Sequence, residues 1–257
     1  MILNSVTKHV NDQNWFAVFL DLLIVVIGVF IGIQASDWNA DRAGEKKAQV
    51  LINRLYGDVS NDNDVIATIL DYHAIVRNYA VTAIDGFNGK KTVNDEQFVI
   101  AAYQASQISP PWAYRSTYNE LLSTGHFDLI KSDELKGLIL SYYSEDWSKN
   151  STITTTATYR EYIRGTIPFL IQDTIRGECG DVAIRVAQTF ADVLPHSCDL
   201  QLPDELFSET AAYLRSQPVM LINLQYQIAV SESQANILAN FGKEAQQLMM
   251  AIHEFQQ

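Results

Sequence analysis

The feature that most constrains this chain is an apolar stretch close to its N-terminus. The 19 residues from Trp15 to Ile33 include a single polar side chain, that of Asp21. A helix needs about 20 apolar residues to cross the hydrocarbon core of a bilayer. Trp38 lies 23 positions after Trp15. This spacing corresponds to about 35 Å of helix, the separation expected of two interfacial aromatic anchors. The stretch therefore predicts a transmembrane helix over residues 15–36.

A cleaved signal peptide is the alternative interpretation of the same stretch. Ile33 and Ala35 suit the positions that precede a signal cleavage site. The short tail before the stretch, residues 1–14, carries only Lys8 as a basic residue, and the apolar run is long for a signal sequence. We therefore expect the stretch to stay in the mature protein as a membrane anchor.

One face of this helix is expected to carry a stripe suited to packing within the membrane. Asp21, Val25, Gly28 and Gly32 follow one another at steps of four, three and four. Two glycines four positions apart let helix backbones approach closely, so the stripe predicts docking on a second copy or on another integral membrane protein. An acid in lipid costs about 2.5 to 3.5 kcal/mol on insertion scales. In one interpretation, Asp21 is a functional group for that reason. In the interpretation that we favour, it is tolerated because nearby headgroups and water reduce the cost of burying its charge.

Two features bear on the side of the membrane that the remaining chain occupies. Lys8 precedes the span and three basic residues follow it at positions 42, 46 and 47, which slightly favours a cytoplasmic domain. Against this, Cys179 and Cys198 are the only two cysteines and lie in a segment with several Gly and Pro residues. A disulfide between them would suit an oxidising compartment and stabilise the fold by about 3 kcal/mol. Two unrelated buried thiols are the alternative, and we favour the disulfide.

The rest of the chain, residues 37–257, has the pattern of a helical bundle. Apolar side chains recur at steps of three and four between positions 48 and 83, and again between positions 221 and 255. These seams predict two long helices, and small residues in the second favour close antiparallel packing. Because no proline occurs from Trp15 to about Asp85, we expect the membrane helix to continue outward as a stalk, with a break near Gly57.

Shorter helices are expected between the two seams. Pro110 and Pro111 interrupt one helix, Gly125 suits a helix end, and Ser132 with its acidic successors suits a helix start. Further helices are predicted at about 94–107, 151–176, 181–193 and 204–216. No strong strand alternation is present. The predicted fold class is therefore all-α: one N-terminal transmembrane helix that continues into an extramembrane bundle with long antiparallel helices.

Two segments resemble an uncharacterised bacterial family of single-pass membrane proteins, a domain of unknown function. DLLIVVIGVFIGIQASDWNADR has the IGxxIGxQxxxWN pattern of the family's membrane helix, and STYNELLSTGHFDLIKSDELKGLILSYY is similar to its central motif. The family has Glu where this chain has Asp21. The resemblance implies a short cytoplasmic tail, one span of the bacterial inner membrane and a periplasmic helical domain, with no activity to transfer.

Signatures of catalysis or metal binding are incomplete in this chain. GFNGKKT, at positions 86–92, lacks the first glycine of a phosphate loop and is interpreted as a turn. The acids around Asp62 alternate as in a calcium loop, but Asn63 replaces the required glycine, so we interpret them as a polar helix face. The five histidines, at positions 9, 73, 126, 196 and 253, lack the spacing of a helical zinc pair. We predict no catalytic residue, cofactor or metal.

His73 is the histidine that falls on an apolar seam. A hydrogen-bonded histidine in the core explains it better than a ligand does, since buried polar groups are normally paired. Asp62 lies three turns away on the same face and is a candidate polar partner.

These patterns favour some classes of function over others. A formal net charge of −12 without a basic patch argues against nucleic acid as a partner. The leading hypothesis is a noncatalytic binding or scaffold subunit that assembles through its transmembrane helix with itself or another integral membrane protein. A tail of about 14 residues is short for an output domain, so a lone sensor is disfavoured. The alternatives are an accessory subunit of an ion- or proton-translocating complex that uses Asp21, and an extracytoplasmic hydrolase with an unrecognised site.

Overall fold

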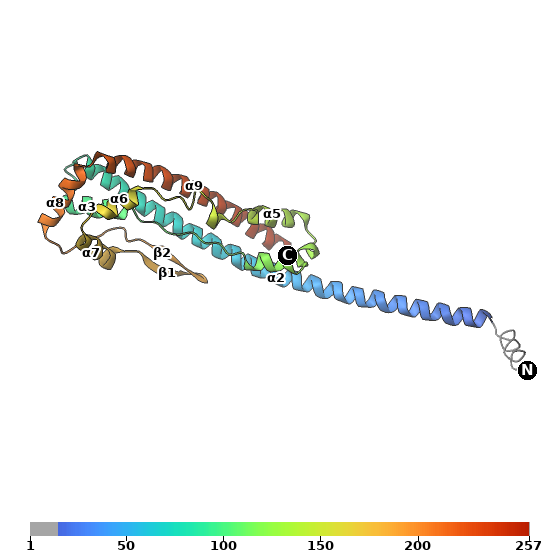
Figure 1. The fold of residues 1–257 in the computed structure, drawn as a ribbon. Helices are drawn as coiled ribbons and strands as arrows, with labels where there is room; N and C mark the ends of the chain where they lie inside the picture. Colours follow the sequence, from blue (N-terminus) through green and yellow to red (C-terminus); the bar gives the residue numbers. More distant parts are fainter. Residues whose placement is uncertain (1–14, 257) are drawn as a thin grey trace, which may run out of the picture.

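The structure, a computed structural model, describes residues 15–256, so the predicted tail at residues 1–14 lies outside the described part of the chain (Figure 1). One helix, α2, runs without a break from Trp15 to Phe87. Its 73 residues correspond to about 110 Å. The expected break near Gly57 is absent: the backbone stays helical there, and a glycine inside a helix costs only about 1 kcal/mol.

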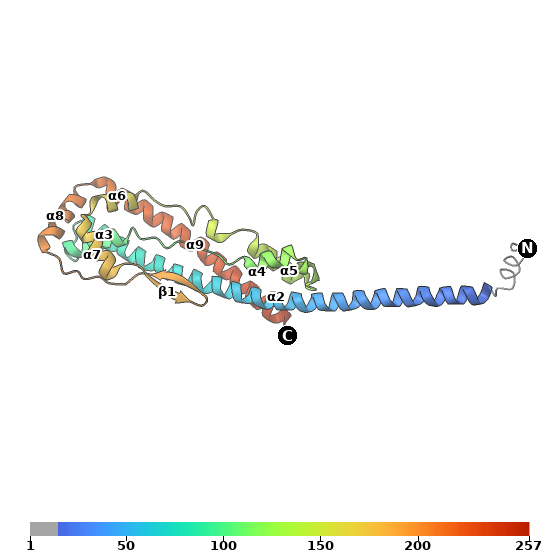
Figure 2. The same ribbon diagram turned by 60° about the horizontal axis from the view of Figure 1, so that its bottom comes forward.

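The remaining elements pack along α2 from about Gly44 to its C-terminal end (Figures 1 and 2). In chain order they are α3 (Asp95–Gln104), α4 (Ser116–Ser123), the short 3-10 helix η1 (His126–Leu129), α5 (Asp133–Tyr143), the 3-10 helix η2 (Trp147–Lys149), α6 (Tyr159–Thr166), α7 (Phe169–Cys179), β1 (Val182–Val186), β2 (Thr189–Val193), α8 (Asp204–Arg215) and α9 (Pro218–Phe255). The all-α class is confirmed, since the only strands in the described residues form one two-stranded hairpin.

Helices α2 and α9 lie antiparallel along the length of the domain, as the two seams predict (Figure 1). At one end, the side chain of Gln256 donates a hydrogen bond to Asn53. At the other end, Arg77 forms an ion pair with Glu232. The 24 positions from Asn53 to Arg77 match the 24 positions from Glu232 to Gln256, so the two helices advance in equal steps. The domain is thus built on one helical hairpin whose arms share a fixed register.

The buried apolar residues form three clusters along this hairpin. The end near the exposed part of α2 is filled by residues of α2, α4, α5 and α9 around Leu51 and Leu248. The far end is filled by α2, α3, α6, α7 and α8 around Phe98 and Phe207. A smaller cluster that includes Trp147 lies in the middle. The middle is therefore where the apolar core is thinnest.

Two predicted helices are wrong. Residues 182–193 form an antiparallel hairpin in which Val182 pairs with Val193, with a turn at Ala187 in the left-handed region (φ 49°). The helix predicted at 151–176 is divided into α6 and α7, because Ile167 precedes Pro168 and is extended (ψ 132°). Pro110 and Pro111 do not interrupt a helix either, since they lie in an irregular segment that begins after α3.

The first part of α2 is a candidate membrane span. It is the one helix of the described residues that is long and apolar enough, and none of its apolar segment is buried. The helix stays exposed until Gly44, where Leu129 first packs against it. Between the apolar stretch and this contact, the Arg42 guanidinium lies over the Trp38 ring at 5.3 Å.

Candidate functional site

Three consecutive seam positions of α9 carry polar side chains. The buried face of this helix passes from Leu224 through Gln227, Ser231 and Gln234 to Leu238, at steps of three and four. All three polar residues are buried, between 6% and 8% exposed. Because burying an unpaired polar group costs free energy, a run of this kind marks a place where the helix faces something other than apolar core.

These side chains line a pocket of about 180 Å³ in the middle of the domain. Its floor is formed by the polar run and Leu238 on α9, together with Ile69, Tyr72 and His73 on α2. Its rim is formed by two irregular segments, residues 107–111 and 153–156. Ile108 and the three threonines at 154–156 are exposed on this rim, whereas the floor is mostly buried. The pocket therefore opens to solvent between two loops and ends on the α2–α9 seam.

His73 and Ser231 meet across the pocket floor. The Nδ1 atom of His73 lies 2.8 Å from the Ser231 hydroxyl oxygen. Burial lowers the pKa of His73 to about 4, so the imidazole is neutral at pH 7. The expectation of a hydrogen-bonded core histidine is met, but its partner is Ser231 and not Asp62.

His73 and Ser231 lack the features that activate a serine nucleophile. A serine nucleophile needs a base with a pKa near the working pH and a third group that orients that base. The pKa of His73 is far below neutrality, and among the described residues no Lys, Arg, Asp or Glu lines the pocket. The chemistry available here is hydrogen bonding to an uncharged guest.

Gln234 fixes one rim loop to the floor. Its amide nitrogen lies 3.2 Å from the Thr152 carbonyl oxygen, 3.0 Å from that of Ile153 and 2.8 Å from that of Thr155. Two amide hydrogens are thus shared among three carbonyl groups, of which that of Thr152 also accepts a hydrogen bond from the Thr155 backbone N–H. The loop is held in place by α9 itself.

A second network fixes the other rim loop. The amide of Gln107 donates to Gln104, and its oxygen accepts a hydrogen bond of 2.6 Å from Arg164. Arg164 also stacks over the Tyr103 ring at 4.7 Å. Charge-assisted hydrogen bonds to a planar guanidinium are among the stronger ones in proteins. Both rims are therefore preformed.

Among the described residues, Gln227 is the floor residue with a fully buried side-chain polar atom that lacks a hydrogen-bond partner. Its side-chain oxygen is buried and has no hydrogen-bond partner among residues 15–256. A buried acceptor without a partner typically costs about 1 to 3 kcal/mol. Gln227 lines the pocket, but almost none of its side-chain oxygen is accessible, so a guest would contact this acceptor only after the amide rotates toward the pocket.

Asp62 lies outside the pocket and anchors the same region. It was expected on a solvated helix face, but its side chain is fully buried. Its two carboxylate oxygens accept hydrogen bonds from the Tyr114 backbone N–H and from the Tyr142 hydroxyl, both at 2.9 Å. Burial raises the pKa of Asp62 to about 6, and the hydrogen bonds oppose this rise. The carboxylate ties the segment after the Pro110–Pro111 rim to α2.

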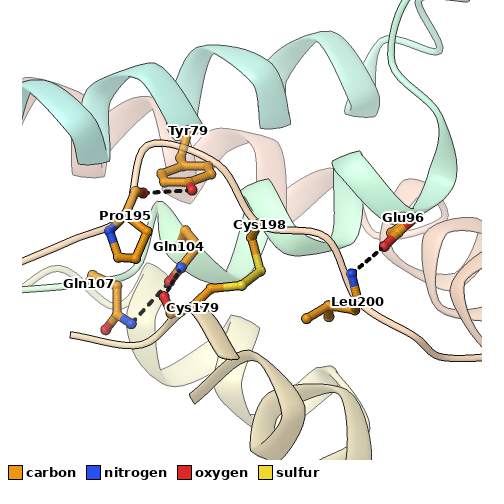
Figure 3. The surroundings of a disulfide bond; sticks show 8 residues. All are labelled: Tyr79, Glu96, Gln104, Gln107, Cys179, Pro195, Cys198 and Leu200. Atoms are coloured by element: carbon orange, nitrogen blue, oxygen red, sulfur yellow. Dashed lines mark hydrogen bonds between the residues drawn. A yellow bond between two sulfur atoms is a disulfide. The ribbon is translucent and has the colours of Figure 1, made fainter. Parts of the chain in front are cut away.

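The predicted disulfide between Cys179 and Cys198 is present, with Cα atoms 5.6 Å apart (Figure 3). It joins the end of α7 to the segment that follows β2. The Gln104 amide donates to the Cys179 carbonyl oxygen at 2.7 Å and also accepts from Gln107 of the pocket rim. As Figure 3 shows, the disulfide and the rim thus share one hydrogen-bonded chain.

The other predicted residues lie along the exposed part of α2. Asp21, Val25, Gly28 and Gly32 are all on helix exposed to solvent, and nothing lies within 4 Å of a Cβ atom added at either glycine. Trp38 is exposed as well, and Trp15 begins the helix. The structure brings none of these residues near the pocket, and the predicted packing and anchoring roles stay predictions.

Sequence reasoning missed the pocket, although one signal for it exists. The polar run on α9 interrupts a seam that is otherwise apolar or small, and this interruption is visible in the sequence. Within the described residues, no group of His, Cys, Asp and Glu is arranged to hold a metal ion. Comparisons of the chain with protein-family models, with curated proteins and with solved structures find no match.

Proposed function

We propose that this chain is a noncatalytic membrane-anchored binding subunit. Its apolar segment would span the inner membrane of a bacterium, and its helical domain would lie in the periplasm. The observation that carries the proposal is the continuity of α2, which runs from an exposed apolar segment into the domain core and there forms part of the pocket floor. A single helix thus serves both as the candidate anchor and as a wall of the candidate binding site.

The disulfide supports an extracytoplasmic domain. Stable disulfides form in oxidising compartments and are rare in a reducing cytosol. Cys179 is buried in the large apolar cluster at the far end of the domain, so the bond belongs to the packed structure. The resemblance to a bacterial single-pass family supports the same location.

The bare glycine stripe supports assembly within the membrane. Exposed backbone at Gly28 and Gly32 offers a close-packing surface that the rest of the described chain leaves uncovered. We propose that a second copy or another integral membrane protein packs there. The domain would then be held near that partner without a catalytic role of its own.

Location is tested with the full chain expressed in a Gram-negative bacterium. The expected result is recovery in inner-membrane vesicles after alkaline extraction, together with digestion of the domain by protease added to spheroplasts. A nonreducing gel should show one internal disulfide. Recovery of a soluble chain cut near Ala35, or protection of the domain in intact spheroplasts, would refute the proposal.

Assembly is tested in mild detergent with matched variants. Gly28→Leu with Gly32→Leu places bulk on the stripe, and Val26→Leu with Phe30→Leu changes the opposite face of the same helix. We expect only the glycine variant to lose the copurifying partner or the dimer, as measured by light scattering and by mass spectrometry. Equal assembly of both variants would contradict packing through the stripe.

A further inference from the structure

We propose that the pocket between α2 and α9 binds an uncharged molecule about the size of one ring that carries a hydrogen-bond donor. The inference rests on the proposed function as a binding subunit, but it does not depend on the membrane anchor. It is carried by three properties of the pocket: its volume, the absence of charge in its lining and an acceptor that the chain leaves unpaired.

The volume limits the size of the guest. The pocket measures about 180 Å³. An apolar protein cavity of about 150 Å³ accommodates benzene, so this pocket takes one ring with a small substituent. The rim loops are fixed by Gln234 and Gln107, so the volume is a property of the folded domain and does not need to be created by the guest.

The lining excludes a charged guest. Within the described chain, no Lys, Arg, Asp or Glu lines the pocket, and His73 is neutral at pH 7 because burial lowers its pKa to about 4. An ion that moved from water to this site would lose its hydration without gaining an opposite charge. Apolar walls from Ile69, Ile153 and Leu238 suit the faces of a neutral ring instead.

The unpaired acceptor selects for a donor. Gln227 is 6% exposed, and its side-chain oxygen has no partner among the described residues. On the rest of the polar run, the Ser231 hydroxyl is paired with His73 and the amide nitrogen of Gln234 with the rim loop. If the Gln227 amide rotates toward the pocket, a guest N–H or O–H can pair with its oxygen and remove the cost of the unpaired acceptor, whereas a guest without a donor leaves that cost in place.

The test uses benzamide and benzoate as probes. The two molecules have nearly the same shape, but benzamide is neutral and donates through its amide, whereas benzoate is an anion without a donor. Binding to the full chain in detergent is measured by saturation-transfer NMR and equilibrium dialysis. We expect benzamide to bind in the millimolar range, as befits so small a probe, and benzoate to bind at least tenfold more weakly.

Two variants locate the binding. Gln227→Leu removes the acceptor and should weaken benzamide binding about tenfold, the effect of one buried hydrogen bond. It should not impair folding, because it removes an unpaired polar atom. Gln247→Leu makes the same substitution at an exposed position of α9 and should change nothing. Thermal unfolding of all three proteins confirms that each is folded.

Several results would overturn the inference. These are equal affinity of benzamide and benzoate, unchanged binding by Gln227→Leu, or no binding of benzamide to the wild type. The second result is expected if Asn223, one turn away with an unpaired amide nitrogen, pairs with Gln227 in solution. Recovery of the same variants in the membrane fraction separates the proposal of a membrane anchor from the proposal of an uncharged ligand. A protein that stays in the membrane fraction but does not bind benzamide refutes only the proposed ligand class.

Discussion

The hydroxyl of Tyr142 donates a hydrogen bond to the carboxylate of Asp62 across 2.9 Å, although 80 positions separate the two residues. Both side chains are buried, with 3% and 0% of their surface exposed. The contact joins α5 to the middle of α2, where the apolar core is thinnest. A polar link therefore holds the domain together about two turns of α2 before the first pocket residue, Ile69.

Replacement of Asp62 by Asn should change how stability depends on pH. The pKa of Asp62 rises from 3.8 to about 6 on folding. Between about pH 4 and pH 6 the folded chain retains a proton that the unfolded chain has released. The contribution of Asp62 to the free energy of unfolding is therefore greatest below pH 4. It falls by about 3 kcal/mol as the pH rises through 6. Asn is neutral throughout: its oxygen can accept from the Tyr114 N–H, and its amide nitrogen can donate to the Tyr142 hydroxyl oxygen.

The measurement is urea unfolding of both proteins from pH 4 to pH 7. The stability of the wild type relative to Asp62→Asn should decline by about 3 kcal/mol over this range. Parallel curves for the two proteins would show that Asp62 does not titrate as a buried acid.

Replacement of His73 by Asn should have the opposite pH dependence. Burial lowers the pKa of His73 from 6.5 to about 4, so the unfolded chain takes up a proton that the folded chain rejects. Stability from this group is present above pH 6.5, and about 3 kcal/mol is lost as pH falls to 4. His73→Asn keeps a polar group near Ser231 but does not titrate.

Relative to His73→Asn, the wild type should therefore lose stability on acidification. In the wild type, the effects of His73 and Asp62 oppose each other between about pH 4 and pH 6, and each variant exposes the effect of the other residue. A pKa of His73 near 6.5, measured by NMR of the folded protein with the resonance assigned by comparison with His73→Asn, would contradict the prediction.

Reduction of the disulfide should loosen the far end of the domain. The bond closes a loop of 19 positions, and its loss should lower the free energy of unfolding by about 3 kcal/mol. Amide hydrogen exchange should become faster in the β1–β2 hairpin and near Gln104, because the disulfide and its hydrogen-bonded neighbours hold both in place. The cluster around Leu51, at the end nearer the exposed part of α2, belongs to a separate core and should keep its protection.

A variant with Cys179→Ser and Cys198→Ser is the control for this experiment, because reductant should not alter its unfolding midpoint. If reductant shifts both proteins equally, or leaves the wild type unchanged, the disulfide does not contribute as predicted.

Two glycines of α2 should respond in opposite ways to replacement by alanine. Gly57 has open space where a Cβ atom would lie, so Gly57→Ala should raise stability by about 1 kcal/mol through helix propensity alone. At Gly86 the ring of Phe98 occupies that space, so Gly86→Ala should destabilise the fold by about 1 to 3 kcal/mol. Thermal unfolding of the two variants and the wild type measures both effects. A Gly86→Ala variant more stable than the wild type would show that the Phe98 ring moves aside freely.

The long helices were predictable because their pattern repeats over many turns. A seam that runs from Ala48 to Ala83 has enough periods to outweigh local exceptions such as Gly57 and Asp62. The same periodic pattern does not show why those exceptions occur. Asp62 is buried because Tyr114 and Tyr142, distant in sequence, supply its hydrogen bonds. Such pairing leaves no trace in the periodicity of α2.

The hairpin at residues 182–193 could not be predicted in the same way. Val182 and Ile184 are exposed, so the apolar residues of β1 do not mark a buried face. The turn contains Ala187 with a positive φ, where Gly or Asn would have given a signal. A short apolar run without a turn signature fits a helix as well as a strand.

The pocket was only half visible in the sequence. Its floor follows from the polar run on α9, which breaks a regular seam. Its rim comes from segments 107–111 and 153–156, which lack regular structure and meet only because Gln234 and Arg164 hold them. Loops that are positioned by contacts distant in sequence carry no local pattern of their own.

The length of α2 has a consequence for how a guest reaches the pocket. From Ile33 to His73 the helix is unbroken, which places about 60 Å between the end of the apolar stretch and the pocket floor. The headgroup layer of a bilayer is only about 5 to 8 Å thick on each side. With the apolar stretch in lipid and α2 upright, a lipid or a small molecule embedded in the bilayer would not extend to this height. A small guest would then enter the pocket from the surrounding water.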